Sequence, residues 1–286
     1  MGRGLAGWVA AALCALVSAA AAQVPAEPPM VRVAGGDYPI GAGAERHTVT
    51  LRAFLIDKYE VTNAAFAAFL NTLDISAKGD AEAGGIGPDI VSGPDADRVF
   101  RSDRAFIELD DDDARIVLRG GRFAPADGRA DAPVPETTWA GARAFCAWRG
   151  ARLPTETEWE AAARGREGRR YPWGAAPPTP GRAVFGRRSG DTAPVHSHAE
   201  GATPEGVFHM AGNVAEWTST LYRPYPYDAA DGREDPAAAG TRVTRGGDHV
   251  FDTAPEKLTA TFRAGFSRNP LRGHRHIGIR CARDAD

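Results

Sequence analysis

The sequence contains only three cysteines among its 286 residues. Cys14 lies in the apolar N-terminal stretch, so removal of that stretch would leave Cys146 and Cys281. Two cysteines in an oxidising compartment predict one disulfide, and they leave no thiol for a second.

The sequence also lacks a block of basic residues, internal repeats and heptads, and its formal net charge is −3. A nucleic-acid partner is therefore not expected, because such proteins usually carry a basic stripe. No stretch beyond the N-terminus is apolar enough to cross a membrane. The length allows one large domain or two small ones, and 33 glycines with 21 prolines favour a loop-rich fold over a helical bundle.

The N-terminus has the pattern of a cleavable signal peptide over residues 1–22. Arg3 precedes an apolar run from Leu5 to Val17, and the small residues Ala20–Ala22 fit a cleavage site. A buried N-terminal helix is the alternative, but the run is short and ends in alanines. Residues 23–29 form a linker rich in proline and alanine, and we expect a periplasmic or secreted protein with no membrane contact after cleavage.

Helix and strand signals follow in order. Residues 30–41 and 47–62 have strand-like alternation. Helices are predicted to begin after Thr62, Thr138 and Thr155, and Glu158 completes a capping box with Thr155. Apolar residues at helical spacing predict the buried faces of these helices; they are Phe66, Phe69, Leu70 and Leu73, then Trp139, Ala142, Phe145 and Cys146, then Trp159, Ala162 and Ala163.

Residues 77–131 differ from the rest because they are rich in glycine, aspartate and proline. We predict a long, partly ordered excursion that contains a hairpin. Asp110–Asp113 form a run of four acids, but the spaced acid pattern of a helix-loop-helix calcium site is absent. A solvated turn is the favoured interpretation of this run.

Three motifs in one order resemble the formylglycine-generating enzyme, or sulfatase-modifying factor, superfamily. They are "ARLPTETEWEAAARG", "GVFHMAGNVAEWTS" and "RVTRGGD" with the later "GIRCA"; "VRVAGGDYPIG" and "FLIDKYEVTNAAFAAFL" match its N-terminal signatures. The resemblance implies one α+β domain over residues 30–286, with little regular secondary structure and a fold related to C-type lectins. It also implies that the cysteine of the helix before "RLPTE" pairs with the last one, here Cys146 with Cys281.

The resemblance implies a copper(I) centre that this chain does not retain. Formylglycine-generating enzymes carry two cysteines shortly after a Gly-Gly pair, and thiolates are the ligands that copper(I) prefers. The matching positions are Phe251 and Glu256. Copper is therefore not expected, nor is copper-dependent oxidation of cysteine to formylglycine.

The family's calcium turn is partly retained. Gly212, Val214 and Glu216 could supply oxygen ligands. The first ligand of the turn, usually Asn or Asp, is His209, and nitrogen is a poor calcium ligand. The resemblance therefore implies calcium as the candidate ion of this turn.

The family's reaction pocket is lined here by Asp248, His249, His274 and His276, with Ala215 in place of a tryptophan. Ala215 suggests a wider opening, and we expect Asp248 and His276 to face each other across it. One interpretation is a site for iron or another metal on the histidines and Asp248. A second is metal-free general acid–base catalysis or binding of a polar ligand by Asp248 and His249. A third is a set of polar residues that only line a binding cleft.

Relatives with altered pockets include exported enzymes that oxidise peptide siderophore chromophores in pyoverdine maturation. The resemblance therefore favours a monomeric periplasmic oxidative enzyme acting on a peptide or small-molecule, siderophore-like substrate. A non-catalytic, lectin-like module that binds peptide or sugar is the alternative. The superfamily's sulfoxide synthases use an HxxxHxE-type iron motif, which this sequence does not contain.

Overall fold

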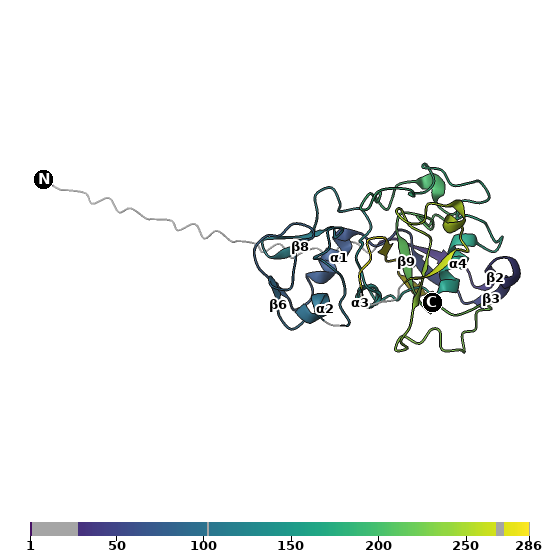
Figure 1. Cartoon of the computed structure of the whole chain (residues 1–286), viewed down its shortest axis with the longest axis horizontal. Helices are drawn as coiled ribbons and strands as arrows, with labels where there is room; N and C mark the ends of the chain where they lie inside the picture. Colours follow the sequence, from purple (N-terminus) through teal and green to yellow (C-terminus); the bar gives the residue numbers. More distant parts are fainter. Residues whose placement is uncertain (2–27, 102, 267–271, 286) are drawn as a thin grey trace.

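The computed structural model describes residue 1 and residues 28–101, 103–266 and 272–285 (Figure 1). Residues 2–22 of the expected signal peptide and residues 23–27 of the linker lie outside these residues. Short strands, long loops and few helices make one α+β domain, which confirms the predicted fold class. Within the described ranges, no helix has the length and apolar character that crossing a bilayer requires.

Most of the strands belong to two sheets, which are accompanied by three two-stranded ribbons. One sheet is antiparallel and has the order β1 (Met30–Val33), β4 (Phe54–Asp57), β13 (Ala282–Asp284). The other has the order β11 (Arg263–Phe266), β10 (Arg242–Arg245), β9 (Ala215–Leu221), β12 (Ile277–Gly278), and β12 runs parallel to β9. The ribbons are β2 (Gly36–Ile40) with β3 (His47–Leu51), β5 (Ser76–Ala77) with β6 (Val91–Ser92), and β7 (Ile116–Arg119) with β8 (Arg122–Pro125).

Among the described residues the helices are α1 (Asn63–Leu70), α2 (Ala96–Phe100), α3 (Trp139–Trp148) and α4 (Glu156–Arg164). Three of them, α1, α3 and α4, begin where the sequence predicts, whereas α2 was not predicted. The hydroxyls of Thr62, Thr138 and Thr155 cap α1, α3 and α4. In the capping box, the Thr155 hydroxyl accepts from the backbone N–H of Glu158 at 3.1 Å, and the Glu158 carboxylate accepts from that of Thr155 at 2.9 Å. Leu73 lies beyond the end of α1, but it still packs against the core.

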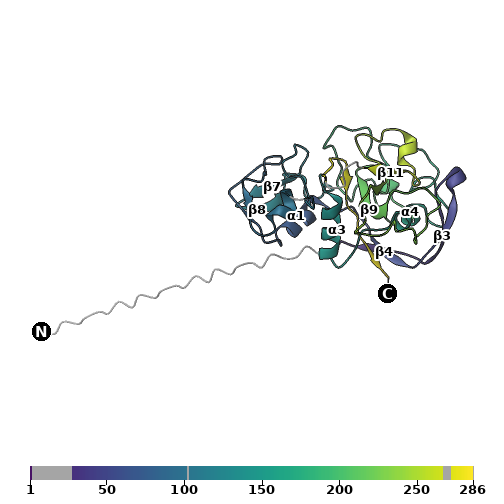
Figure 2. The same cartoon turned by 60° about the horizontal axis from the view of Figure 1, so that its bottom comes forward.

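The molecule has a smaller and a larger lobe, and α3 lies between them in both views (Figures 1 and 2). The smaller lobe contains α1 and the β7–β8 hairpin, and the larger contains α4 and β9. One core cluster runs from α1 through α3 to Trp217 of β9, and a second surrounds Trp159 of α4. Because β9 contacts α4 and also reaches the first cluster, the two lobes share one continuous framework.

The excursion at 77–131 contains the predicted hairpin, β7–β8, but it is more ordered than predicted. Ile86, Val91, Val99 and Leu109 are buried in the first core cluster. The segment was interpreted as loop because its apolar residues are sparse and separated by glycines and acids. Burial against α1 and α3 supplies the order that local pattern does not indicate.

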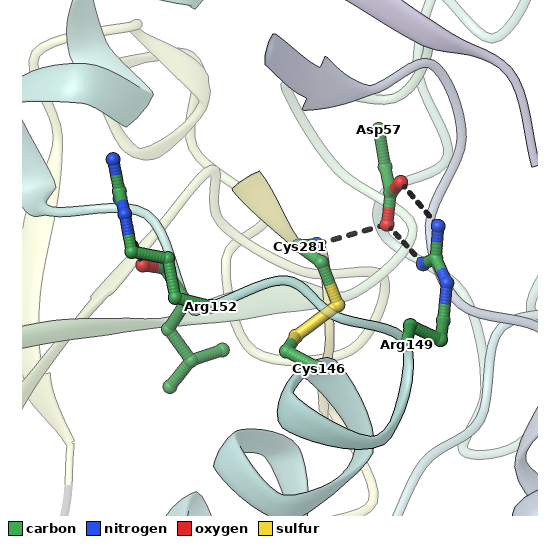
Figure 3. Close-up of a disulfide and its surroundings, with 6 residues drawn as sticks. Asp57, Cys146, Arg149, Arg152 and Cys281 are labelled. Atoms are coloured by element: carbon green, nitrogen blue, oxygen red, sulfur yellow. Dashed lines mark hydrogen bonds and ion pairs between the residues drawn. A yellow bond between two sulfur atoms is a disulfide. The ribbon is translucent and has the colours of Figure 1, made fainter. Parts of the chain in front are cut away.

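The predicted disulfide joins Cys146 of α3 to Cys281, which precedes β13 (Figure 3). Beside it, the carboxylate of Asp57 accepts from the backbone N–H of Cys281 at 3.0 Å and from the guanidinium of Arg149 at 2.7 and 3.0 Å. The bridge spans a sequence separation of 135 residues and fastens the last strand to the middle of the chain. The pairing that the sequence predicts is confirmed.

Buried ion pairs tie α4 to the larger sheet. Glu160 is fully buried and binds Arg164 at 2.7 Å and Arg245 of β10 at 2.6 Å. Glu156 is also fully buried, and its two carboxylate oxygens accept hydrogen bonds from the guanidinium of Arg263 of β11 at 2.8 and 2.9 Å. Since β10 leads directly into the Gly246–Gly247 turn, these pairs fix the start of the candidate site.

Candidate functional site

Strand β10 ends in a glycine pair that turns the chain sharply. Gly246 and Gly247 have φ values of 98° and 68°, which side chains rarely adopt. A Cβ on Gly247 would lie 2.6 Å from the backbone oxygen of Lys257. The turn therefore requires glycine at position 247, and it directs the next two side chains into the protein.

Asp248 is buried, with 1% of its surface exposed, and it organises the loop that follows. Its Oδ1 accepts from the backbone N–H groups of Val250 and Phe251, both at 2.7 Å, as in an Asx turn. Burial, followed by the charge of Asp248, raises the pKa of the neighbouring Asp252 to about 6. Asp248 thus acts first as a cap for the loop.

His249 is fully buried, and its ring orientation is fixed. Its Nδ1 lies 2.7 Å from the backbone oxygen of Asn213. Because a carbonyl oxygen can only accept, Nδ1 carries the proton and Nε2 carries a lone pair. Nε2 is buried and has no hydrogen-bond partner among the described residues. Burial lowers the pKa of His249, so the ring is neutral and Nε2 is available as an acceptor or base.

His276 and His274 approach the same place from the segment before β12. Their ring centroids are 5.7 Å apart, and His274 also lies 6.2 Å from the ring of Trp217. The pKa of His276 is lowered to about 4, mainly by burial. The charge of Asp248 opposes this shift, and the charges of His274 and His249 add to it. The structure therefore brings the four predicted pocket residues within electrostatic reach of one another.

This cluster is a buried one rather than the open cleft that the sequence suggested. Asp248, His249 and His276 are between 0 and 4% exposed, and Ala215 is 6% exposed. The exposed group at this place is Phe251, which is 58% exposed and packs edge-on against His276 with ring centroids 4.8 Å apart. Ala215, in place of the family's tryptophan, was expected to widen the pocket. Instead, Phe251 covers the imidazole of His276.

A second cluster lies beside the histidines and was missed by the sequence analysis. One carboxylate oxygen from each of Glu108, Asp111 and Glu136 lies within 4.8 Å of those of the other two. Among the described residues, this trio forms a group of three convergent metal-ligating atoms, whereas the histidines and Asp248 do not. The geometry therefore does not support the interpretation of a three-ligand metal site on the histidines.

Glu136 is the buried member of this trio, and it adjoins His274. Its backbone N–H donates to the backbone oxygen of His274 at 3.1 Å. Burial and the charges of Asp111 and Glu108 raise the pKa of Glu136 to about 8. Its φ is 59°, a backbone conformation that glutamate seldom adopts, so no local pattern announces its position.

The acidic run at Asp110–Asp113 was the only signal for this region, and its interpretation as a solvated turn was partly wrong. Asp110 and Asp112 are exposed, as expected. Asp113, however, is buried and binds Arg115, Arg275 and Ser189 at 3.1, 3.0 and 2.7 Å. Alternate residues of the run therefore face solvent and protein.

The position of the family's calcium turn carries a donor set that does not fit calcium well. Both carboxylate oxygens of Glu216 are occupied, by Arg280 at 2.7–3.0 Å and by the indole N–H of Trp159 at 2.6 Å. His209 offers a nitrogen, and burial lowers its pKa to about 3. Calcium held by Gly212, Val214 and Glu216 remains a prediction, and these contacts argue against it.

Comparison with known proteins gives a consistent picture of ancestry. The sulfatase-modifying factor enzyme 1-like domain model matches residues 16–285. The formylglycine-generating enzyme of Streptomyces coelicolor is 36% identical over 88% of this chain and 85% of its own. The hercynine oxygenase of Mycolicibacterium thermoresistibile is 34% identical over 87% of this chain but only 55% of its own.

Solved structures support the fold. PvdO from Pseudomonas aeruginosa has a TM-score of 0.59 at 20% identity, covering 90% of this chain and 95% of that one. CarF has a TM-score of 0.56 at 19% identity, covering 92% of this chain and all of the other. Structural similarity at this level of identity shows a shared fold, and the chemistry must be argued from the residues of the site.

Proposed function

Since this chain belongs to the sulfatase-modifying factor enzyme 1-like family, whose members include oxidative enzymes, we propose that it is an exported oxidative maturation enzyme. Its substrate in this proposal is a peptide or a siderophore-like small molecule. The proposal excludes formylglycine generation by copper(I), and it assigns the reacting centre to the buried histidine cluster.

The copper(I) centre implied by the family does not fit the residues present. Phe251 offers no ligand atom, and Glu256 is an exposed carboxylate, which copper(I) binds poorly. No step is therefore assigned to copper at this place.

The observation that carries the proposal is the buried lone pair on Nε2 of His249. An imidazole whose Nδ1–H is held by a backbone carbonyl presents Nε2 in one tautomer and one orientation. A positioned, neutral imidazole is a common general base, and such bases typically contribute 10²–10⁴-fold to a rate. The nearby His276 is also neutral, so it places no positive charge beside the base.

Base catalysis restricts the substrate to one that reacts with dioxygen once it is deprotonated. A catechol or similar electron-rich phenol meets this requirement. His249 would take one hydroxyl proton while the ring passes two electrons to dioxygen. That proton and the one from the second hydroxyl would go to the reduced dioxygen, giving a quinone, hydrogen peroxide and the neutral imidazole again. Phe251 would offer an exposed aromatic surface against which such a ring could stack.

Export is supported by two features of the chain. The N-terminal sequence has the signal-peptide pattern, and the Cys146–Cys281 disulfide suits an oxidising compartment such as the periplasm. Periplasmic or secreted location is part of the proposal.

The test is oxygen consumption by purified mature protein with a peptide that carries a catechol side chain. We expect stoichiometric peroxide, and a loss of roughly 100-fold or more in His249→Asn. Asparagine can still donate to the Asn213 carbonyl, so the loop should remain folded. His209→Asn is the matched control, because His209 is buried outside the cluster and its φ of 53° suits asparagine. A full rate in His249→Asn would refute the role of this base.

The alternative is a binding module without chemistry, and the burial of the cluster is the observation that favours it. If Asp248 and His249 merely support the loop, the exposed Phe251 would belong to a recognition surface. Binding of the peptide without oxygen uptake, weakened by Phe251→Ala and unchanged by His249→Asn, would establish this alternative. Elemental analysis of protein purified without chelator adds an independent check on bound metal.

A further inference from the structure

We propose that Glu108, Asp111 and Glu136 form a binding site for a divalent cation that prefers oxygen ligands, with calcium as its preferred ion. The site is separate from the Gly212–Glu216 turn, and it lies next to the histidine cluster. It concerns ion binding rather than the oxidative reaction, so it stands or falls independently of that reaction.

Three segments that are distant in the sequence hold the site together. The backbone N–H of Glu108 donates to the backbone oxygen of Glu136 at 3.0 Å, and that of Thr138 donates to Phe106 at 3.1 Å. The N–H of Glu136 in turn donates to the oxygen of His274 at 3.1 Å. The carboxylates therefore project from a paired framework, which limits their freedom to move apart.

Glu136 provides an observation that points to a ligand. Its side chain is 2% exposed, and its Oε1 is buried with no hydrogen-bond partner among the described residues. A buried carboxylate oxygen normally finds a donor, because its desolvation is costly otherwise. One carboxylate oxygen of Glu108 and one of Asp111 lie within 4.8 Å of a carboxylate oxygen of Glu136. A cation between the three would satisfy this oxygen and remove the repulsion.

The local charge agrees with a divalent ion. The three carboxylates carry a formal −3, and Arg272 compensates one of them through an ion pair with Glu108 at 2.5 Å. Arg275 forms its own ion pair with Asp113 at 3.0 Å, outside the trio. The remaining formal charge of the trio with Arg272 is −2, which one divalent cation neutralises.

The kind of donor set favours calcium over magnesium. Oxygen ligands lie roughly 2.3–2.6 Å from calcium, so two ligands on opposite sides can be about 4.6–5.2 Å apart. Around magnesium the same separation is only about 4.0–4.2 Å. The trio's atoms lie within 4.8 Å of one another, a limit that both ions can meet. Calcium is favoured because it accepts irregular arrangements of protein oxygens, whereas magnesium demands near-ideal octahedral geometry and usually keeps several waters.

The test is the melting temperature of the whole mature protein, first stripped with chelator and then titrated separately with calcium, magnesium and manganese. We expect calcium to raise the melting temperature by several degrees at millimolar concentration, because it binds the folded state alone. Magnesium should act more weakly. Terbium(III) luminescence, competed away by calcium, gives a direct reading of occupancy.

The variants are Glu136→Gln and, as a matched control, Asp112→Asn. Glu136→Gln should fold, and in chelator it should melt no lower than the wild type, since it relieves repulsion among the carboxylates. It should lose the calcium-induced shift, with affinity weakened roughly tenfold or more. Asp112→Asn removes one charge from the same acidic run at an exposed position outside the trio, and it should keep the shift. The proposal is overturned if none of the three ions shifts the wild type, or if the shift survives in Glu136→Gln.

Discussion

Two regions of this molecule bury charged and polar groups, and they do so differently. Around α4, Glu156 and Glu160 each bind arginines through both carboxylate oxygens. Beside the histidine cluster, Glu136 and His249 are equally buried, yet each keeps an atom without a partner among the described residues. In the first arrangement every carboxylate oxygen of Glu156 and Glu160 has an arginine donor. In the second, an acceptor atom is left that only an added proton, cation or substrate can complete.

This difference separates structural from functional burial. A buried carboxylate with an arginine on each oxygen has exchanged water for protein donors, so it can stay ionised. A buried lone pair or carboxylate oxygen without a donor lowers stability unless a substrate, proton or cation completes it. We therefore assign the α4 network to the fold, and Glu136 and His249 to function.

The largest expected effect comes from breaking a buried pair next to the α4 network, where Glu216 accepts from Trp159 of α4 and from Arg280. Arg280→Leu would leave Glu216 beside Glu60, both buried, and burial together with the charge of Glu216 already raises the pKa of Glu60. We expect a loss of about 3–5 kcal/mol in the free energy of unfolding, as for other buried pairs that lose one partner. Urea denaturation measures it. Arg119→Leu, at an exposed ion pair with Asp127, should leave the midpoint unchanged within error. Equal effects at both positions would contradict the distinction.

The disulfide gives the next largest effect. Replacing Cys146 and Cys281 by alanine should lower the free energy of unfolding by about 2–5 kcal/mol, because the bridge restricts a long loop of the unfolded chain. Non-reducing peptide mapping of periplasmic material should also show one cross-linked peptide and no free thiol. Two alkylatable thiols in that material would contradict both the bridge and the export that we propose.

The smallest expected effect is a pH dependence at the edge of the site. The folded-state pKa of Asp252 is raised to about 6, so its neutral form stabilises the fold below its unfolded pKa of about 4. That contribution is lost as the pH rises from about 4 to 6. Asp252→Asn should therefore be more stable than the wild type at pH 7.5, by on the order of 1 kcal/mol after solvent screening.

The advantage of Asp252→Asn should shrink towards zero at pH 4. Denaturation curves of both proteins at these two pH values measure it, and Asp37→Asn at an exposed position serves as a control. A constant difference across this range would mean that Asp248 and Asp252 do not share the environment described above.

The parts of the structure that the sequence predicted depend on local patterns. The capping box of Thr155 and Glu158 is set within one helical turn, and two cysteines leave one pairing. The missed parts depend on contacts between distant segments. Glu136 meets Asp111 because its left-handed backbone and the segment around His274 place it there, and no spacing in the sequence encodes that.

The histidine cluster lies between these cases. Its position followed from the order of motifs, so Asp248, His249, His274 and His276 were gathered correctly. Their burial was not foreseen, because the exposed or buried state of a loop depends on what covers it. Here Asp248 turns its carboxylate to its own loop, and Phe251 packs over His276.

The central claim is that this chain lacks the family's copper-binding thiolate pair, because phenylalanine and glutamate occupy the two matching positions. The most direct measurement is mass-spectrometric detection of formylglycine in a sulfatase-type "CxPxR" peptide, with copper(I) and oxygen supplied. We predict no product from this protein, because Phe251 and Glu256 stand where two thiolates are required. Turnover comparable with that of an authentic formylglycine-generating enzyme, measured side by side, would contradict the claim.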